Sequence, residues 1–321
     1  MRVLYDTRTV HPLDRYDYYR AGAGAELAPV TVDGRSPGRL LAAMSVARIG
    51  DFEIEGVTWA ADSEVVARRT HRLIRSCDPE CYRILLCVDG RLGMEQAGNH
   101  VEFRARDVAL YDLSRPWQSM HPTGPAPTRV VMLTFPRASV PIARAAVRPL
   151  LGTLVPKRLP GRSLIVQFLT GLTEAAHDPG LVDVLQECTV GLIRQRLGQP
   201  DGITPRTRRL LRMACIHEII RRHLGDPTLD PEGIARAANI SPRYLYKLFQ
   251  EAELTPMQLI KRLRLEECRR RLRDPALGVT PIKDLIAPHG YLRPDQFARD
   301  FKKLFGVSAT EVRRLASGSE G

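Results

Sequence analysis

Two segments in the last third of the chain combine a polar, basic face with an apolar face at the spacing of a helix. In the first segment, Leu245, Leu248 and Phe249 recur at the i, i+3 and i+4 positions of a buried helix face. The opposite face holds Ser241, Arg243, Tyr246, Lys247 and Gln250. Because arginine can pair with the edge of guanine and glutamine with that of adenine, this face has the chemistry for reading the major groove of DNA.

The second segment repeats this pattern further along the chain. Its apolar positions, at i, i+4, i+7 and i+8, are Phe297, Phe301, Leu304 and Phe305. Its polar face holds Arg293, Gln296, Arg299, Lys302 and Lys303. Asp295 lies in the first turn, where it would repel a nearby phosphate. We therefore expect the first segment to read bases and the second to bind mainly phosphates.

The ten polar residues divide into two expected kinds of contact. Base contacts are expected mainly from Arg243, Tyr246 and Lys247 in the first segment, with Gln250 as a further DNA-binding residue, and from Arg293, Gln296 and Arg299 in the second. Phosphate contacts are expected from Ser241, Lys302 and Lys303. Phosphate contacts position a protein on DNA without specifying the sequence.

Each segment is preceded by the elements of a helix-turn-helix. Short apolar faces are formed by Ile234, Ala235 and Ala238 before the first segment, and by Ile282, Leu285 and Ile286 before the second. Asn239 can adopt the left-handed conformation that ends a helix, and Ser241 can cap the next one. Gly290 supplies the second turn, Gly306 ends the second segment, and 308–311 form a capping box.

A helix from Thr255 to Arg273 is predicted between the two units. At 1.5 Å per residue it would be about 28 Å long. Successive major grooves on one face of DNA lie about 34 Å apart. A connector of this length could hold two recognition helices one turn of DNA apart.

The charge of the chain is concentrated in the same region. The whole chain has 48 Lys and Arg against 36 Asp and Glu, a net charge of +12. Residues 203–321 contain 23 and 14 of these, a net of +9, and residues 1–202 contain 25 and 22, a net of +3. This asymmetry is typical of nucleic-acid binding, although a solvated arginine-rich surface would give the same count.

Residues 40–135 have the pattern of a β-rich domain. Apolar or alternating runs occur at 45–49, 52–59, 82–88, 91–96, 101–103, 107–111 and 129–135. Asp89-Gly90 and Gly98-Asn99 between such runs are hairpin signals. Many short strands at this spacing predict a sandwich or barrel of the jelly-roll type.

Residues 140–197 change to a helical period. Leu185, Cys188 and Leu192 form an apolar seam that could be a dimer interface or could pack against the sheet, and we favour the dimer. The predicted domains are a sensing and dimerisation domain at 1–198, a linker at 199–212 and a DNA-binding domain at 213–321. The fold class is therefore α+β, with a β-sandwich or barrel and trailing helices followed by an all-α domain.

Aromatic residues of the β-rich region are candidates for a small-molecule pocket. Trp59, Tyr111 and Trp117 could line such a pocket or form part of the core. Arg115 could pair with Asp112 to hold the neighbouring loop. No histidine pair or zinc-type cysteine pair is present, so we expect no metal, no other cofactor and no catalytic residue.

The two segments resemble a known family. Residues 240–249 (ISPRYLYKLF) and 296–308 (QFARDFKKLFGVS) are similar to the two signatures of AraC/XylS-type transcriptional regulators. The similarity covers about 213–316, including Arg264 and Leu265. Three positions depart from the pattern: Ile286 replaces a small alanine, Pro288 would shorten its helix, and Ala309 replaces a proline. Residues 106–117 (RDVALYDLSRPW) resemble a cupin-type sensing domain found in some of these regulators.

This resemblance implies a regulator that binds double-stranded promoter DNA and acts mainly as an activator. It also implies a small-molecule effector, a homodimer and RNA polymerase as a further partner. We expect a cytoplasmic protein with no membrane contact, because no apolar run reaches the length of a membrane span and no secretory signal is visible. Two alternatives remain open: a cupin-type metal enzyme or binding protein with an accessory helical region, and a regulator controlled by a protein partner instead of a ligand.

Overall fold

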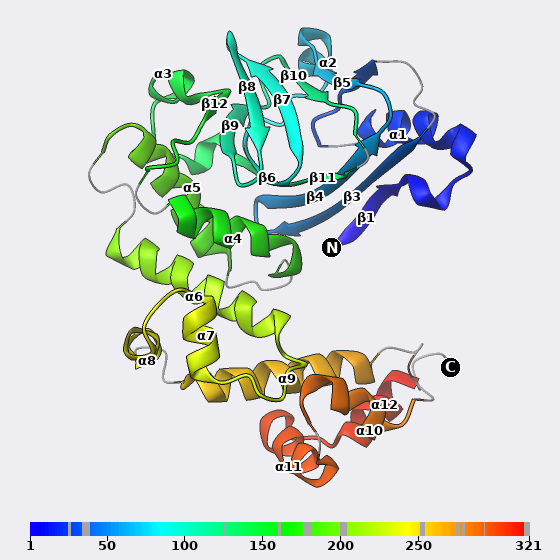
Figure 1. Cartoon of the computed structure of the whole chain (residues 1–321), viewed down its shortest axis with the longest axis vertical. Coiled ribbons are helices and arrows are strands. Elements are labelled where there is room, and N and C mark those ends of the chain that lie inside the picture. Colours follow the sequence, from blue (N-terminus) through cyan, green and yellow to red (C-terminus); the bar gives the residue numbers. More distant parts are fainter. Residues whose placement is uncertain are drawn as a thin grey trace. The chain divides into compact units, whose positions relative to one another are not determined.

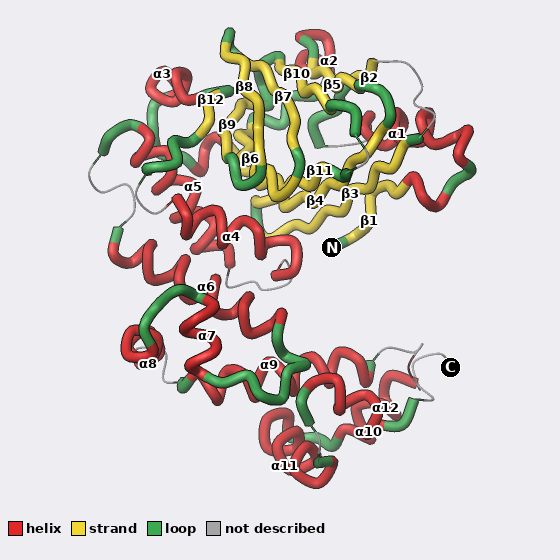
Figure 2. The backbone as a smooth tube through the Cα atoms, viewed as in Figure 1, coloured by secondary structure: helices red, strands yellow, loops and turns green. Residues whose placement is uncertain are grey.

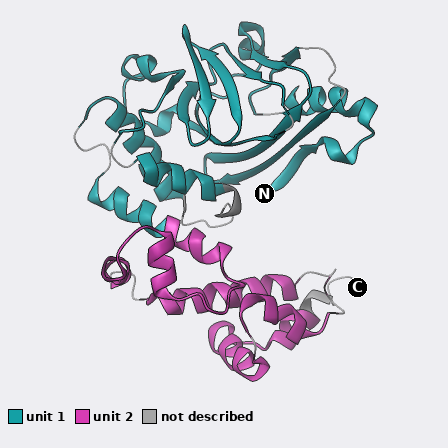
Figure 3. Ribbon diagram, viewed as in Figure 1, with its two compact units in different colours: residues 1–214 teal, residues 215–321 magenta. Residues whose placement is uncertain are grey.

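The computed structural model divides the chain into two compact units, residues 1–214 and residues 215–321 (Figure 3). It describes residues 1–24, 27–33, 39–124, 126–159, 162–175, 181–199, 204–250, 254–273, 277, 280–291 and 293–317. Strands and helices build the first unit, and the described part of the second unit consists of helices (Figure 2). None of the helices in the described ranges is both long and apolar enough to cross a membrane.

Two antiparallel sheets form the body of the first unit (Figure 1). The seven-stranded sheet has the order β1 (Arg2–Asp6), β3 (Leu40–Ile49), β4 (Phe52–Ala61), β11 (Thr128–Pro136), β6 (Cys81–Asp89), β9 (Val108–Asp112) and β12 (Thr153–Leu154). The five-stranded sheet has the order β2 (Thr31–Asp33), β5 (Val65–Arg69), β10 (Trp117–His121), β7 (Arg91–Gln96) and β8 (Asn99–Arg104). All seven predicted runs lie within or largely within these strands. The predicted sandwich is confirmed, and the described strands form no closed barrel.

A continuous apolar core fills the space between the two sheets. It includes Met44, Trp59 and Met132 from the larger sheet, and Met94 and Phe103 from the smaller one. β7 alternates buried and more exposed residues, which is the pattern of a strand with one face buried, whereas residues on both faces of β11 are buried. The inner faces of the sheets therefore enclose the aromatic residues that the sequence singled out.

The two predicted hairpins have different outcomes. Gly98 lies in a tight turn between β7 and β8, where Gln96 pairs with Asn99 and Ala97 and Gly98 both have positive φ angles, so this hairpin is confirmed. Asp89-Gly90 is not a hairpin, because β6 and β7 belong to different sheets. Gly90 has a φ of +82°, and a Cβ there would lie 2.7 Å from the Cα of Thr128. This glycine lets the chain cross closely from one sheet to the other.

Helices complete the first unit: α1 (Arg15–Gly24), α2 (His71–Ser76), α3 (Arg144–Val147), α4 (Arg162–Ala175) and α5 (Leu181–Arg196). α4 contacts β4, β6 and β11. On α5, Leu185, Cys188 and Leu192 are at most 2% exposed within a single copy of the chain. The prediction of a dimer interface at this seam is therefore wrong, because its side chains are already buried.

The second unit contains the predicted helices. They are α6 (Pro205–Arg222), which begins in the first unit, α7 (Pro231–Ala237), α8 (Pro242–Gln250), α9 (Pro256–Leu272), α10 (Ile282–Ile286), α11 (Pro294–Phe305) and α12 (Ala309–Ser317). Residues 205–212 of the predicted linker are helical, and residues 200–203 lie outside the described residues. Thr204 starts α6 by accepting a hydrogen bond from the backbone N–H of Thr207. The domain limits remain a prediction.

Candidate nucleic-acid interface

The first helix-turn-helix consists of α7, a tight turn and α8. Asp230 caps α7 by accepting a hydrogen bond from the backbone N–H of Gly233 at 2.7 Å. Asn239 has a φ of +54°, which confirms the predicted left-handed turn. The backbone N–H of Tyr244 then donates to the Ser241 Oγ at 3.2 Å, so Ser241 caps α8 as expected. These local bonds fix the direction in which α8 leaves the turn.

α8 has one fully buried face and one exposed face. Leu245, Leu248 and Phe249 are at most 4% exposed. The predicted DNA-binding residues of this unit, Ser241, Arg243, Tyr246, Lys247 and Gln250, are all exposed. Tyr246 is 45% exposed, so its ring is not part of the core. The structure therefore gathers the five residues on the solvent side of one short helix.

The second helix-turn-helix consists of α10, a short 3-10 helix at Ala287–His289 and α11. α10 ends at Ile286, as expected from Pro288 in the following turn. Gly290 has a φ of +74°, and a Cβ there would lie 2.7 Å from the Cζ of Arg264. This turn is therefore packed directly against a side chain of α9.

Arg264 is a positioning residue that connects the two helix-turn-helix units. Its Nε donates to the backbone oxygen of Leu224 at 3.0 Å, and its Nη2 donates to that of Asp226, both in the turn before α7. The same guanidinium contacts Gly290 before α11. Burial lowers the pKa of Arg264. The sequence marked Arg264 only as part of the family pattern and gave no indication of this role.

α11 presents the second group of predicted DNA-binding residues. Phe297 and Phe301 are at most 2% exposed and hold the helix against the domain core. Arg293, Gln296, Arg299, Lys302 and Lys303 are all exposed. Gly306 ends the helix with a φ of +74°, and Ser308 and Glu311 form the predicted capping box.

The prediction that Leu304 belongs to the buried face of α11 is wrong. Leu304 is 41% exposed. Phe305 instead completes the apolar face, because its ring lies 4.7 Å from that of Phe301 and 4.6 Å from the guanidinium of Arg269 on α9.

Three of the six basic residues of the connecting helix α9 form ion pairs within the protein. The ion pairs are Lys261–Asp300 at 2.7 Å, Arg262–Glu266 at 2.8 Å and Arg270–Glu267 at 2.6 Å. Within the described ranges, no acidic side chain forms an ion pair with Arg243, Lys247, Arg293, Arg299 or Lys303. Positive charge without an acidic partner is therefore present on the exposed faces of α8 and α11.

α9 is close to the predicted connector. It has 17 residues and would be about 26 Å long at 1.5 Å per residue. Thr255 and Gln258 form a capping box at its start. α8, α10, α11 and α12 all contact α9, so both recognition helices are attached to one continuous element.

The aromatic effector-pocket candidates lie inside the sandwich. Trp59 and Tyr111 are at most 3% exposed, and Trp117 is partly buried against the same core. The rings of Tyr111 and Trp117 lie 5.5 Å apart. Trp59 lies 4.9 Å from both Tyr19 and His121. The three candidates thus share the interior of the sandwich and make three ring contacts in two separate groups.

Three buried nitrogen atoms in this interior have no hydrogen-bond partner among the described residues: Trp59 Nε1, Trp117 Nε1 and His121 Nδ1. The other ring nitrogen of His121 lies 3.2 Å from the Ser119 Oγ. Burial lowers the pKa of His121 to about 4, so its ring is neutral at pH 7. The sequence analysis did not single out His121. Its position two and four residues after Ser119 and Trp117 on one strand face was the available signal.

Arg115 has the predicted structural role, and the neighbouring cysteines form no metal site. Arg115 lies 3.5 Å from Asp112, as predicted for a residue that holds this loop. Cys77 is exposed and Cys81 is buried, and burial raises the pKa of the Cys81 thiol to about 11. Among the residues that the structure describes, no group of three or more His, Cys, Asp or Glu side chains is placed to hold a metal ion.

Comparisons with known proteins agree with both parts of the chain. The model of an AraC-binding-like domain matches residues 19–197, and that of a helix-turn-helix domain matches residues 234–315. The transcriptional activator NphR of Rhodococcus sp is 26% identical over 274 residues, which cover 83% of this chain and 78% of that protein. The XylDLEGF operon transcriptional activator of Pseudomonas putida is 34% identical over 84 residues, about a quarter of either protein.

Among solved structures, the crystal structure of the AraC-like transcriptional activator CuxR matches with a TM-score of 0.49 at 19% identity, over 88% of this chain and 98% of that one. The AraC-binding-like model alone spans more than half of the chain. The protein thus belongs to the AraC-type transcriptional regulators, with an AraC-binding-like domain followed by a helix-turn-helix domain.

Proposed function

We propose that this regulator binds specific promoter sequences through α8 and α11 and activates transcription in response to a small molecule. The observation that carries the proposal is the shared exposure of ten side chains on two short helices whose opposite faces are buried. Exposed arginine, lysine and glutamine side chains on the face of such a helix supply what base and phosphate recognition need. The names of NphR and of the P. putida relative, both transcriptional activators, support activation.

The two helix-turn-helix units make different contacts with DNA. Arg243, Tyr246, Lys247 and Gln250 read bases from α8, and Arg293, Gln296 and Arg299 are the candidates on α11. Ser241, Lys302 and Lys303 contact phosphates. Asp295 is exposed in the first turn of α11 and disfavours close approach of a phosphate there. α8 therefore contributes more of the sequence preference than α11 does.

The effector binds in the interior of the sandwich, between Trp59, Tyr111 and Trp117. Two indole N–H groups without partners support this placement, because a buried unsatisfied donor costs about 1–3 kcal/mol and a ligand can supply the missing acceptor. The effector accordingly carries hydrogen-bond acceptors on a largely apolar frame. The protein acts as a cytoplasmic homodimer and contacts RNA polymerase at its promoters.

Genome-wide mapping of bound DNA in living cells tests the proposal. The chain should occupy a small set of sites near promoters, and Arg243→Ala/Lys247→Ala should lose them. The matched control is Arg262→Ala/Arg270→Ala, which removes two exposed arginines that are paired with glutamates on α9. Equal loss of sites in both double variants, or no enriched sites in the unaltered chain, would contradict specific recognition by α8.

A further inference from the structure

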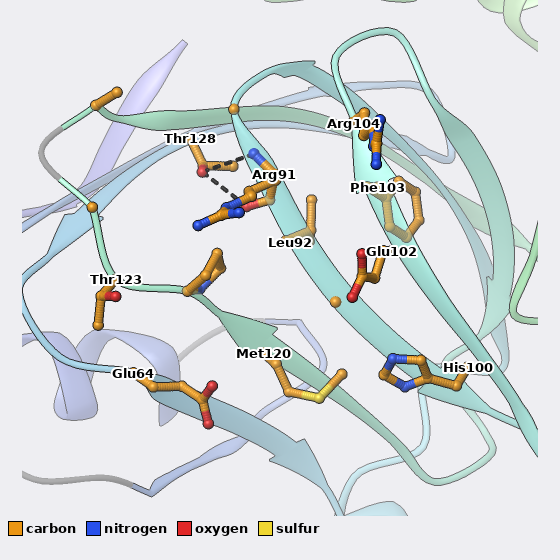
Figure 4. A pocket seen from close by; sticks show the side chains of 15 residues that line it. Glu64, Arg91, Leu92, His100, Glu102, Phe103, Arg104, Met120, Thr123 and Thr128 are labelled. Atoms are coloured by element: carbon orange, nitrogen blue, oxygen red, sulfur yellow. Dashed lines mark hydrogen bonds between the residues drawn. The ribbon is translucent and has the colours of Figure 1, made fainter.

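A groove lies on the outer face of the five-stranded sheet, away from the aromatic interior. Its volume is about 880 Å³, within the usual range for small-molecule sites. Strands β7, β8 and β10 form its floor, and the segment that follows β10 forms one wall (Figure 4). The core residues Leu92 and Phe103 also line it, but Trp59, Tyr111, Trp117 and the residues of the DNA-binding helices do not.

Gly93 leaves the middle of this floor open. It is the cross-strand neighbour of Glu102 on β8 and of Met120 on β10, so three adjacent strands meet at this position. A Cβ at Gly93 would lie 2.7 Å from the terminal Cε of Met120. The thioether therefore occupies the space next to the glycine and provides an apolar surface between charged side chains.

Two arginines on neighbouring strands lie at one end of the groove. Arg91 and Arg104 are directly paired in the register of β7 and β8, and both are exposed. Like charges placed directly opposite on neighbouring strands destabilise a sheet. Neither side chain makes a hydrogen bond or an ion pair with any residue in the described ranges. An anion held between the two guanidinium groups would remove this repulsion, and a carboxylate matches their planar donors.

Two acidic side chains, Glu64 and Glu102, also line the groove. In Figure 4 the two arginines lie in the upper part, Glu64 lies at the lower end, and Glu102 lies between them. Neither glutamate is paired with a basic side chain within the described part of the chain. The groove therefore offers unpaired positive charge at one end, an apolar floor, and unpaired negative charge beyond it.

We propose that this groove binds a small amino acid with a short apolar chain. Its carboxylate lies between Arg91 and Arg104, its ammonium group lies against Glu102 and Glu64, and its hydrocarbon part rests on Met120. Occupancy of this surface site gives the regulator a second small-molecule input, separate from the interior pocket and from DNA.

Calorimetric titration of the purified full-length chain with four six-carbon probes tests this chemistry. The probes are 2-aminohexanoate, 6-aminohexanoate, hexanoate and hexylamine. We expect saturable binding of at least one aminohexanoate, at least tenfold weaker binding of hexanoate, and weaker binding still of hexylamine. Hexanoate binding as tightly as both amino acids, or no saturable binding of either amino acid, would overturn the proposal.

Variants locate the site. Arg91→Gln should weaken binding of the preferred aminohexanoate at least tenfold, whereas Arg129→Gln should not, because Arg129 is an exposed arginine on β11 paired with Asp89 outside the groove. Arg104→Glu should abolish binding without lowering the melting temperature, since it replaces a like-charge pair by an opposite-charge pair. Equal loss in the Arg129 variant would overturn the assignment.

DNA affinity without ligand should be the same in Arg91→Gln as in the unaltered chain. This readout separates the two proposals, because failure of amino-acid binding leaves DNA recognition by α8 untouched.

Discussion

Individual side chains in the DNA-binding unit differ mainly in whether another protein group already neutralises them. Lys261 is exposed, but Asp300 lies 2.7 Å from its ammonium group. Lys303 is also exposed and has no such partner within the described residues. Lys261 and Lys303 contribute equally to the net charge. Of these two, only Lys303 is available to bind a phosphate.

Replacing Lys303 by alanine should weaken binding to all DNA sequences by a similar factor. One lost phosphate contact should also reduce the slope of log affinity against log salt by about 0.9. Titrations of specific and random duplexes over a range of salt concentrations measure both effects. Lys261→Ala is the matched control and should change the slope less. A loss confined to one sequence would rule out the phosphate role.

Buried His121 makes the stability of the AraC-binding-like domain depend on pH. Burial holds its pKa at about 4, below the value of 6.5 for an unperturbed histidine. Between these values the unfolded chain binds a proton that the folded chain does not, so the free energy of unfolding falls as the pH falls from 6.5 towards 4. The slope from this one group is at most about 1.4 kcal/mol per pH unit.

Denaturant unfolding at several pH values measures this slope. His121→Gln should flatten it, and His71→Gln, which changes an exposed histidine, should not. The same slope in His121→Gln as in the unaltered chain would show that other groups cause it.

At the scale of elements, the turns decide how the recognition helices are presented. Asn239 holds a left-handed conformation between α7 and α8. Asn239→Gly should preserve folding and DNA affinity, because glycine adopts this conformation readily. Asn239→Val should cost at least about 1–2 kcal/mol of stability, because a branched side chain is strained there. Thermal unfolding and DNA titration of the two variants check this, and equal behaviour would contradict a turn that depends on positive φ.

Local signals predicted the helical unit well and the sandwich less completely. Asn239, Gly306 and Ser308 act through bonds to residues within a few positions, so sequence alone was enough to find them. Strands β1 and β2 were not predicted, because residues 1–37 carry loop-like compositions and their pairing partners are distant in sequence. Asp89-Gly90 has hairpin residues, but which sheet each strand joins is decided by long-range packing.

The same division applies to the candidate site. The polar faces of α8 and α11 follow from helical spacing, which is local. The hydrogen-bond partners of Arg264 and the pairing of Arg91 with Arg104 could not be found from spacing. Both depend on contacts between separate strands, helices and turns.

At the scale of the whole molecule, the proposed response to a small molecule requires that the AraC-binding-like domain binds a ligand. Thermal unfolding of the full chain with a panel of small carboxylates and carbonyl compounds should identify a ligand that raises the melting temperature. At a concentration 100 times its dissociation constant, such a ligand increases the free energy of unfolding by about 2.7 kcal/mol. Trp117→Phe keeps an aromatic ring but removes the unpaired indole N–H, so it should reduce this rise in melting temperature. Arg104→Glu changes only the outer groove and should leave the shift intact. A shift equal in Trp117→Phe and the unaltered chain would contradict an interior site at Trp117.

Sequence recognition by α8 is tested most directly by selecting bound duplexes from a random DNA pool with the purified full-length chain and with Arg243→Ala. The unaltered chain should enrich one motif, and Arg243→Ala should bind that motif about 1–3 kcal/mol more weakly with relaxed preference at one or two neighbouring base pairs. Enrichment of the same motif with unchanged affinity by both proteins would contradict base reading by Arg243.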